Sequence, residues 1–192
     1  MTLLILGLVL FLGVHSTRIF ADGWRTATIA RIGEKPWKGV YSVLSIAAFV
    51  LLVWGYMRAR QNPVLLWTPP AGMRHVAAML MVPAFMLFVA AYVPRNWFRA
   101  KLHHPQMLSV KVWALAHLLA NGMLIDLLLF GAFLVWAVLG YTAARRRDRA
   151  AGTVYAAATA QGTAIAAVAG LVAWAVFAFW LHGWLFGVKP FG

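Results

Sequence analysis

Long apolar runs alternate along the chain with short polar segments that carry most of the positive charge. A run of about 18 or more apolar residues is long enough to cross the hydrocarbon core of a bilayer as a helix. We therefore predict an all-α integral membrane protein, a bundle of six transmembrane helices forming a single domain over residues 1–192. The predicted spans are residues 2–20, 40–57, 73–93, 105–121, 123–142 and 159–186.

Residues 105–142 allow two interpretations. As one helix they would be about 57 Å long, whereas the hydrocarbon core is about 30 Å thick. The pair Asn121-Gly122 is typical of a helix end and divides the stretch into two spans. The alternative is a five-helix bundle with one long kinked helix over residues 105–142.

The distribution of charge favours six spans. The chain has 17 Lys and Arg residues against 4 Asp and Glu residues, a net charge of +13. With six spans and the N-terminus outside, thirteen of these cations lie on one side and four on the other. Positive residues accumulate on the cytoplasmic side of membrane proteins. We therefore expect a multi-pass protein of the cell inner membrane with both termini periplasmic.

Composition supports the same class. The chain is 64% hydrophobic and 11% charged, with a mean hydropathy of +0.80, which is more apolar surface than a soluble domain of this length can bury. The net charge alone would suit nucleic acid, but no nucleic-acid motif or basic, aromatic-studded patch is present. With no cysteine, disulfides, thiolate metal sites and thiol nucleophiles are excluded. The lipid bilayer is the expected partner, and nucleic acid is not.

The stretch 104–122 is mainly Leu, Val, Ala and Trp, yet it contains several polar side chains. Polar groups inside an apolar helix are costly in lipid, so they usually face the bundle interior and mark function. A rotation of about 100° per residue places a mixed set of side chains on one face. That face consists of Gln106, Val110, Trp113, His117 and Asn121.

Two of the six histidines, His15 and His117, lie inside apolar segments. Neutral imidazole is a common ligand of haem iron and of transition metals. The competing interpretation is structural: a hydrogen bond to Ser16, to Asn121 or to a backbone carbonyl. Positions near span ends, where headgroup or solvent contacts are expected, hold the other four, His75, His103, His104 and His182.

A site made from two histidines must combine different helices. His104 and His117 are 13 residues apart, about 20 Å along one helix, so they cannot bind the same iron. His15 and His117 are the obvious pair on different helices. Their expected depths are about 8 and 18 Å from the cytoplasmic side, which requires tilted helices or a tilted haem plane. No spacing typical of zinc or non-haem iron occurs.

The charged candidates each have a simpler interpretation beside a functional one. Arg18, Arg95 and Arg99 can hold haem propionates, although contacts to lipid phosphates are the default expectation. Asp126 is the only acidic residue well inside an apolar segment, where it can carry a proton or accept a hydrogen bond near the outer surface. With one such carboxylate and no internal repeat, a small transporter has little support.

Five parts of the sequence stand out together. They are His15 in the first span, IGEKPWKGVYSVLS at 32–45, HPQMLSVKVWALAHLLANG at 104–122, LFGAFLVWAVL at 129–139 and HGWLFG at 182–187. Together these blocks resemble the NnrU family, relatives of the plant and cyanobacterial 15-cis-zeta-carotene isomerase. The central block is the most specific, although Ser109 stands where NnrU-like sequences usually have glycine, and residues 123–126 read MLID where a more polar stretch is common.

The resemblance implies a cofactor and its ligands. The isomerase branch binds haem b, and its two proposed axial histidines correspond to His15 and His117 here, with His104 in a supporting role. Trp113 and Asn121 share the predicted face of His117 and are included in the cofactor site, together with the three arginines named above. The resemblance assigns no catalytic residue.

We therefore expect a haem b-binding membrane protein with a redox or isomerase-like role, or one associated with denitrification and with nitrite and nitric oxide metabolism. A hydrophobic polyene or a small gaseous molecule would be its ligand. The first alternative is a non-enzymatic accessory or sensor protein for nitrite and nitric oxide respiration, acting with a respiratory membrane protein. The second alternative is a small transporter.

Overall fold

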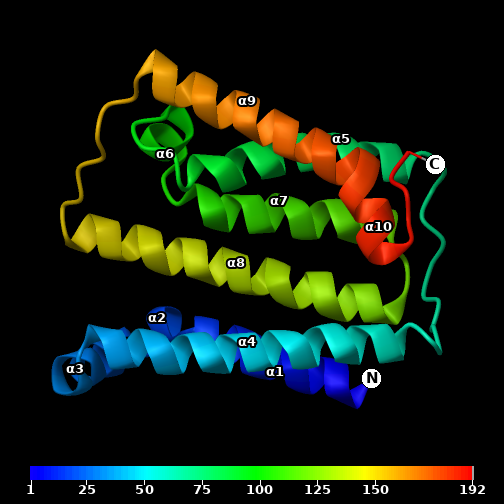
Figure 1. Cartoon of the computed structure of the whole chain (residues 1–192), viewed down its shortest axis with the longest axis horizontal. Coiled ribbons are helices and arrows are strands. Elements are labelled where there is room, and N and C mark those ends of the chain that lie inside the picture. The colour runs from blue at the N-terminus through cyan, green and yellow to red at the C-terminus, as the bar shows by residue number, and fades with distance from the viewer. Residues whose placement is uncertain (192) are drawn as a thin grey trace.

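The structure is a computed structural model and describes residues 1–191. Within these residues all regular elements are helical, and one isolated bridge pairs Leu65 with Met123 (Figure 1). In chain order the elements are α1 (Thr2–His15), α2 (Thr17–Phe20), α3 (Asp22–Ile32), α4 (Glu34–Ala59), α5 (Met73–Ala90), α6 (Trp97–Leu102), α7 (Pro105–Ala120), α8 (Leu124–Ala150), α9 (Ala160–Val176), the π-helical turn η1 (Phe177–Leu181) and α10 (His182–Phe186).

Four helices are long and apolar enough to cross a membrane: α4, α5, α8, and the continuous helix Ala160–Phe186 that α9, η1 and α10 form together. The other two predicted spans are shorter. α1 has 14 residues and α7 has 16, about 21 and 24 Å at the usual helical rise, against a core of about 30 Å. The all-helical membrane class is confirmed, whereas the count of six spans stays a prediction.

The alternative of one long kinked helix over residues 105–142 is wrong, because the chain reverses between α7 and α8. The amide of Leu124 donates to the carbonyl of Val64 over 2.9 Å, and the amide of Leu66 donates to the carbonyl of Gly122 over 2.9 Å. A Cβ at Gly122 would overlap the carbonyl oxygen of Trp67. This close approach needs glycine, as the Asn121-Gly122 signal predicts.

Helices extend beyond the predicted spans at the basic end of the molecule. The expected connector 21–39 contains α3 and the start of α4, and α8 continues through the arginine run to Ala150. Pairs one turn apart support these extensions, with Lys38 Nζ 2.7 Å from Glu34 Oε1 and Arg145 Nη1 3.4 Å from Asp148 Oδ2. The predicted first span is divided at Ser16, where α1 ends.

Glycines bring the apolar helices into close contact. A Cβ at Gly7 of α1 would lie 2.5 Å from Leu52 Cα of α4, and a Cβ at Gly55 would lie 2.5 Å from the Leu4 nitrogen. Small residues allow helix backbones in membranes to approach and gain dispersion contacts. α1 and α4 therefore pack as a tight pair, and a similar contact joins Gly170 of α9 to Met86 of α5.

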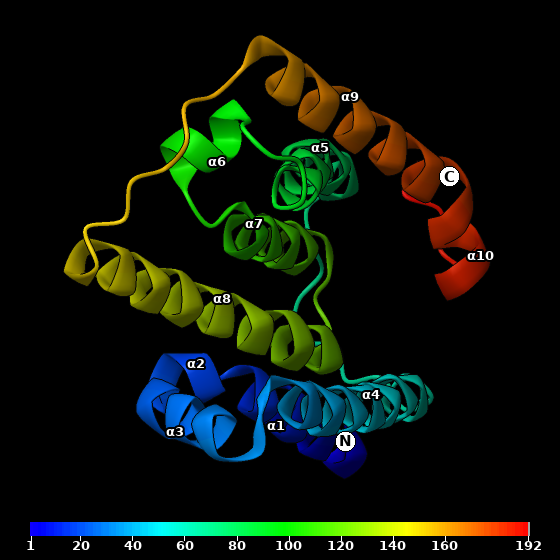
Figure 2. The ribbon, with the colours of Figure 1, turned by 60° about the vertical axis from the view of Figure 1, so that its left-hand side comes forward.

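α8 lies between two groups of helices (Figure 2). On one side it faces the α1–α4 pair, and on the other it packs against α7, which packs on α5. The buried core follows this arrangement and draws on α1, α4, α7 and α8, with Leu4, Leu8, Leu52, Ala59, Ala114, Ile125, Leu129 and Phe130.

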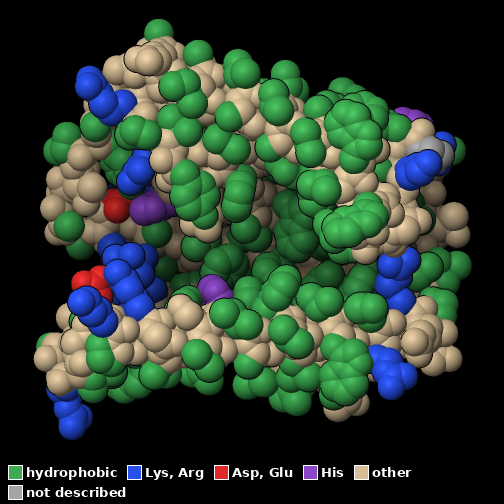
Figure 3. Space-filling model, viewed as in Figure 1, with side chains coloured by type: hydrophobic (Ala, Val, Ile, Leu, Met, Phe, Trp, Pro, Cys, Tyr) green, Lys and Arg blue, Asp and Glu red, His purple; other side chains and the backbone are tan. Residues whose placement is uncertain are grey.

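The outer surface is that of a lipid-embedded protein. Large apolar side chains are exposed along α4, such as Val43 at 67% and Ile46 at 64%. Figure 3 shows Lys and Arg side chains gathered toward two ends of one face, with hydrophobic side chains between them and a hollow along the middle. This banding matches helices that cross an apolar layer with their ends in headgroups or water.

Candidate functional site

His15 is the last residue of α1, and a hydrogen bond within that helix holds its ring. Nδ1 lies 2.7 Å from the carbonyl oxygen of Phe11, one turn earlier. The Phe11 ring lies 4.2 Å away between centroids, and the rings of Tyr41 from α4 and Trp136 from α8 meet the imidazole edge-on. The imidazole therefore sits where three helices meet.

His117 repeats this arrangement on α7. Its Nδ1 lies 2.8 Å from the carbonyl oxygen of Trp113, again one turn earlier. The Trp113 ring is 5.5 Å away, and Phe130 of α8 stacks on the imidazole at 4.5 Å with an interplanar angle of 27°. The predicted partner Asn121 instead donates from Nδ2 to the backbone carbonyl of His117, over 2.8 Å.

The two hydrogen bonds fix the same tautomer at both histidines. A backbone carbonyl can only accept, so Nδ1 carries the proton and Nε2 carries the lone pair. Within residues 1–191, no hydrogen bond to Nε2 of His15 or His117 is formed. An Nδ1–H held by a carbonyl, with Nε2 left over, is the usual arrangement of a histidine that binds a metal.

Aromatic rings lie in series between the two imidazoles. From His15 the row passes through Phe11, then Phe133 at 5.9 Å from Phe11, then Trp113 at 5.4 Å from Phe133, and ends at His117. Three side chains from α1, α7 and α8 thus form a chain of ring contacts that connects the predicted ligands. The arrangement provides two similar imidazoles at the ends of one apolar row.

A cavity of about 470 Å³ opens beside His15. Its wall includes the cations Arg18, Arg25 and Lys38 and one carboxylate, Glu34, which is paired with Lys38. Arg18 and Arg25 each approach Asp22, at 3.8 and 3.9 Å. Arg18 therefore lines the same cavity as His15. Arg25 and Lys38 were not anticipated, because they belong to what looked like a connector.

The remaining predicted site residues lie elsewhere. Arg95 and Arg99 line a separate cavity of about 290 Å³ near α6. His104 precedes α7, whereas His117 lies near the end of that helix. The Nε2 of His104 lies 2.8 Å from Asp148 Oδ2. The structure therefore groups Trp113 and Asn121 with His117, and separates His104 and these two arginines from both imidazoles.

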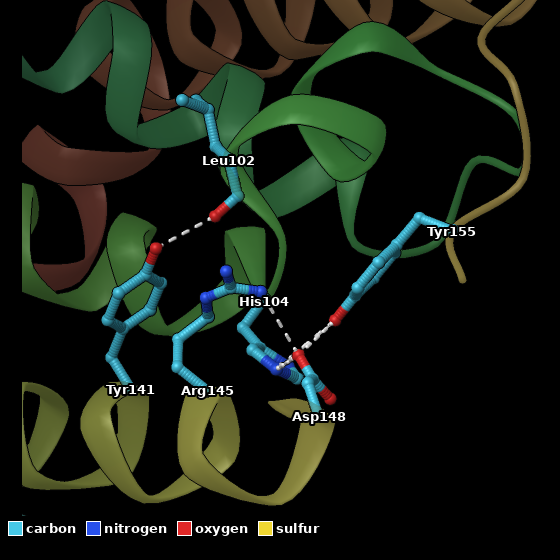
Figure 4. A network of polar contacts seen from close by, with 6 residues as sticks. All are labelled: Leu102, His104, Tyr141, Arg145, Asp148 and Tyr155. Carbon is cyan, nitrogen blue, oxygen red and sulfur yellow. Dashed lines mark hydrogen bonds and ion pairs between the residues drawn. The ribbon is translucent and has the colours of Figure 1, made fainter. Parts of the chain in front are cut away.

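A polar cluster surrounds His104 (Figure 4). The hydroxyl of Tyr155 donates to Asp148 Oδ2 over 2.6 Å and lies 3.3 Å from His104 Nε2, and Arg145 approaches the same oxygen at 3.4 Å. Burial, followed by this bond to Asp148, raises the pKa of Tyr155 to about 12. The sequence analysis missed the cluster, because its members are up to 51 residues apart and Tyr155 stands in an irregular segment.

Asp126, in the first turn of α8, is hydrogen-bonded to a side chain of α4. It is 5% exposed and accepts a hydrogen bond of 2.7 Å from the Tyr56 hydroxyl. Of the two predicted roles, the structure supports that of a hydrogen-bond partner. Within residues 1–191, no group of three or more His, Cys, Asp or Glu residues is arranged to hold a metal ion.

The fold and these residues define a class: a helical membrane protein whose apolar interior holds two similarly constrained imidazoles. The family model described as NnrU protein matches residues 3–190, nearly the whole chain. The chain therefore belongs to the NnrU family, as the sequence blocks predict. No curated protein and no solved structure matches the chain.

Proposed function

We propose that this NnrU-family membrane protein binds haem b, with Nε2 of His15 and Nε2 of His117 as the candidate iron ligands. The observation that supports this proposal is the hydrogen bond from Nδ1 to the carbonyl four residues earlier, which occurs at both histidines and leaves Nε2 with its lone pair.

The surroundings of each imidazole suit part of a haem. At His15, the cavity is lined by Arg18, Arg25 and Lys38, which would exchange their present contacts with Asp22 and Glu34 for contacts with the propionates. At His117, the stacked Phe130 and the neighbouring Trp113 provide an apolar, aromatic wall for a macrocycle. The residues present therefore fit the group.

The ligand number is a separate question. Because Phe11, Phe133 and Trp113 form a chain of ring contacts from one imidazole to the other, the arrangement favours one histidine per iron over an iron that both would share. A shared iron requires these rings to move. The two cases differ in spin state, because one strong axial imidazole favours a high-spin spectrum and two favour a low-spin spectrum.

When bound, haem b would supply redox or isomerisation chemistry toward an apolar polyene, or bind a small gas such as nitric oxide. The protein's contribution would be to orient the imidazoles through their Nδ1 bonds, to exclude water with the ring row and to pair the propionates with cations. The alternative is a non-enzymatic accessory or sensor role in nitrite and nitric oxide respiration. Turnover of a poly-cis carotene by purified protein, compared with the denitrification phenotype of a deletion strain, distinguishes the two.

The test is the absorption spectrum of the full-length protein purified in detergent after haem-replete expression. We expect a Soret band that His117→Ala and His15→Ala weaken or shift. The matched control is His75→Ala, because His75 is exposed at the start of α5. No Soret band in the wild type, or equal spectra for all three variants, would overturn the proposal. Loss in only one of the two site variants would assign a single axial ligand.

A further inference from the structure

We propose that the cavity beside α6 is a binding site for a phosphate group, supplied by the headgroup of an anionic phospholipid. The cavity has a volume of about 290 Å³. It lies between residues 94–96 of the α5–α6 turn, with residues 99 and 100 of α6, on one side and residues 153–156 of the α8–α9 connection on the other. This inference does not depend on haem, since neither His15 nor His117 lines the cavity.

The charge of the lining is entirely positive. Arg95 and Arg99 are its charged residues, and the lining contains no carboxylate. Within residues 1–191, no ion pair or side-chain hydrogen bond engages either guanidinium. Arginine binds phosphate through paired N–H donors, so two unengaged guanidiniums beside a cavity suit a phosphate oxygen cluster.

Both walls of the cavity are held in place. On the connection, Tyr155 is fixed by its bond to Asp148 and by the ring of His103 at 4.2 Å, and Thr159 donates its amide to the Arg95 carbonyl over 2.7 Å. On the turn, Asn96 is 0% exposed and is fully bonded. Its Nδ2 donates to two carbonyls of the preceding turn, and its Oδ1 accepts from the amide of Arg99.

The carboxylate nearest to Tyr155, that of Asp148, lies outside the lining of the cavity. Its Oδ2 is shared by Tyr155, His104 and Arg145 (Figure 4). The carboxylate is therefore compensated and does not repel a phosphate. Across the cavity, the backbone amides of residues 154–156 form no hydrogen bond within the described chain and are available to an anion.

The position of the cavity favours a lipid as the phosphate source. Trp97 begins α6 and is 46% exposed, as expected of an aromatic residue at the membrane interface. The cavity also lies at the end of the molecule where α8 carries its arginine run. Basic pockets between helices at that level of a membrane bind anionic headgroups.

The experiment titrates the full-length protein in neutral detergent with dioctanoyl phosphatidylglycerol by isothermal calorimetry. Phosphatidylcholine of the same chain length is the lipid control. We expect Arg95→Gln with Arg99→Gln to weaken binding about 25-fold, or about fivefold for each arginine. The matched control, Arg146→Gln with Arg149→Gln, removes two exposed cations from the same end of the molecule and should change binding less than twofold.

Tyr155→Phe keeps the aromatic ring but removes the bond to Asp148, and we expect it to weaken binding severalfold through the loosened wall. Equal losses in the two double variants would indicate a diffuse positive surface and would overturn the site. Unchanged binding in the Arg95 and Arg99 double variant would also overturn the site. Glycerol phosphate that competes at equal concentration would support the phosphate chemistry and overturn the lipid source. Because no step uses haem, a missing Soret band leaves this result unaffected.

Discussion

The hydroxyl of Tyr56 lies 2.7 Å from Asp126 Oδ1, and this bond joins the end of α4 to the first turn of α8. Asp126 is one of three buried polar or charged residues among those described, and its carboxylate also lies near the positive N-terminus of its helix. The bond therefore satisfies a group that would be costly in an apolar environment.

Tyr56→Phe removes this donor and leaves the carboxylate oxygen without it. We expect a loss of about 1–2 kcal/mol in stability, measured as a lower melting temperature in detergent. Tyr92→Phe is the control, because Tyr92 is 65% exposed. Equal melting temperatures for the wild type and Tyr56→Phe would show that the bond does not contribute.

Gly55→Ala tests the close contact of α1 with α4. The added Cβ would lie 2.5 Å from the Leu4 nitrogen, so the helices must separate. We expect a destabilisation of about 1–3 kcal/mol. Gly13→Ala is the matched control, since nothing lies within 4 Å of its Cβ position and alanine favours the helix by about 0.5–1 kcal/mol. A Gly55 variant as stable as the Gly13 variant would contradict the packing.

His103 gives the basic end of the molecule a pH dependence. Burial, and then the nearby Arg145 guanidinium, lower the pKa of His103 below its ordinary value of 6.5. As the pH falls, the unfolded chain therefore takes up the proton first. The contribution of neutral His103 to the free energy of unfolding is present above pH 6.5 and is lost as the pH falls below this value. The charge of Asp148 raises the pKa of His103, whereas His104 lowers it, as Arg145 does.

We expect the melting temperature of the wild type to fall more between pH 7.5 and 5.5 than that of His103→Asn. Asparagine is the replacement because its side chain is polar but does not titrate in this pH range. His75→Asn, at an exposed position, should retain the slope of the wild type. Parallel curves for the wild type and the His103 variant would exclude this histidine as the source.

The six-span topology can be tested by cysteine labelling, because the chain has no cysteine of its own. Six spans with both termini periplasmic place Gln61→Cys, in the α4–α5 connection, in the periplasm. They place Thr153→Cys, in the α8–α9 connection, in the cytoplasm. We expect an impermeant maleimide to label Gln61→Cys in cells with a permeabilised outer membrane and to label Thr153→Cys only after lysis. Labelling of both from the same side would refute six spans.

Structural features that depend on neighbouring residues could be predicted well from the sequence. The apolar runs and the Asn121-Gly122 end of the fourth predicted span each depend on a few adjacent residues, and each is found in the structure. α3 was not predicted, because its polar residues resemble a connector when the bundle beneath them is unknown. Sequence periodicity describes one helix at a time, so it does not show which helices pack against one another.

The candidate site shows the same limit. His15 and His117 are recognisable from the sequence because a histidine in an apolar run is unusual in itself. Their Nδ1 bonds, the ring row and the cavity beside His15 depend on which helices are neighbours, and no local pattern encodes that. The cluster of His104, Asp148 and Tyr155 is a stronger example, since it joins a helix start, an arginine run and an irregular segment.

The place of α8 between two groups of helices has a mechanical consequence. α1 packs tightly on α4 and meets the rest of the bundle through α8. His15 travels with the first group and His117 with the second, so a rocking of one group about α8 would change the spacing of the imidazoles while each group stays intact. Such a motion would compress or open the ring row, because Phe11 belongs to the first group and Trp113 to the second.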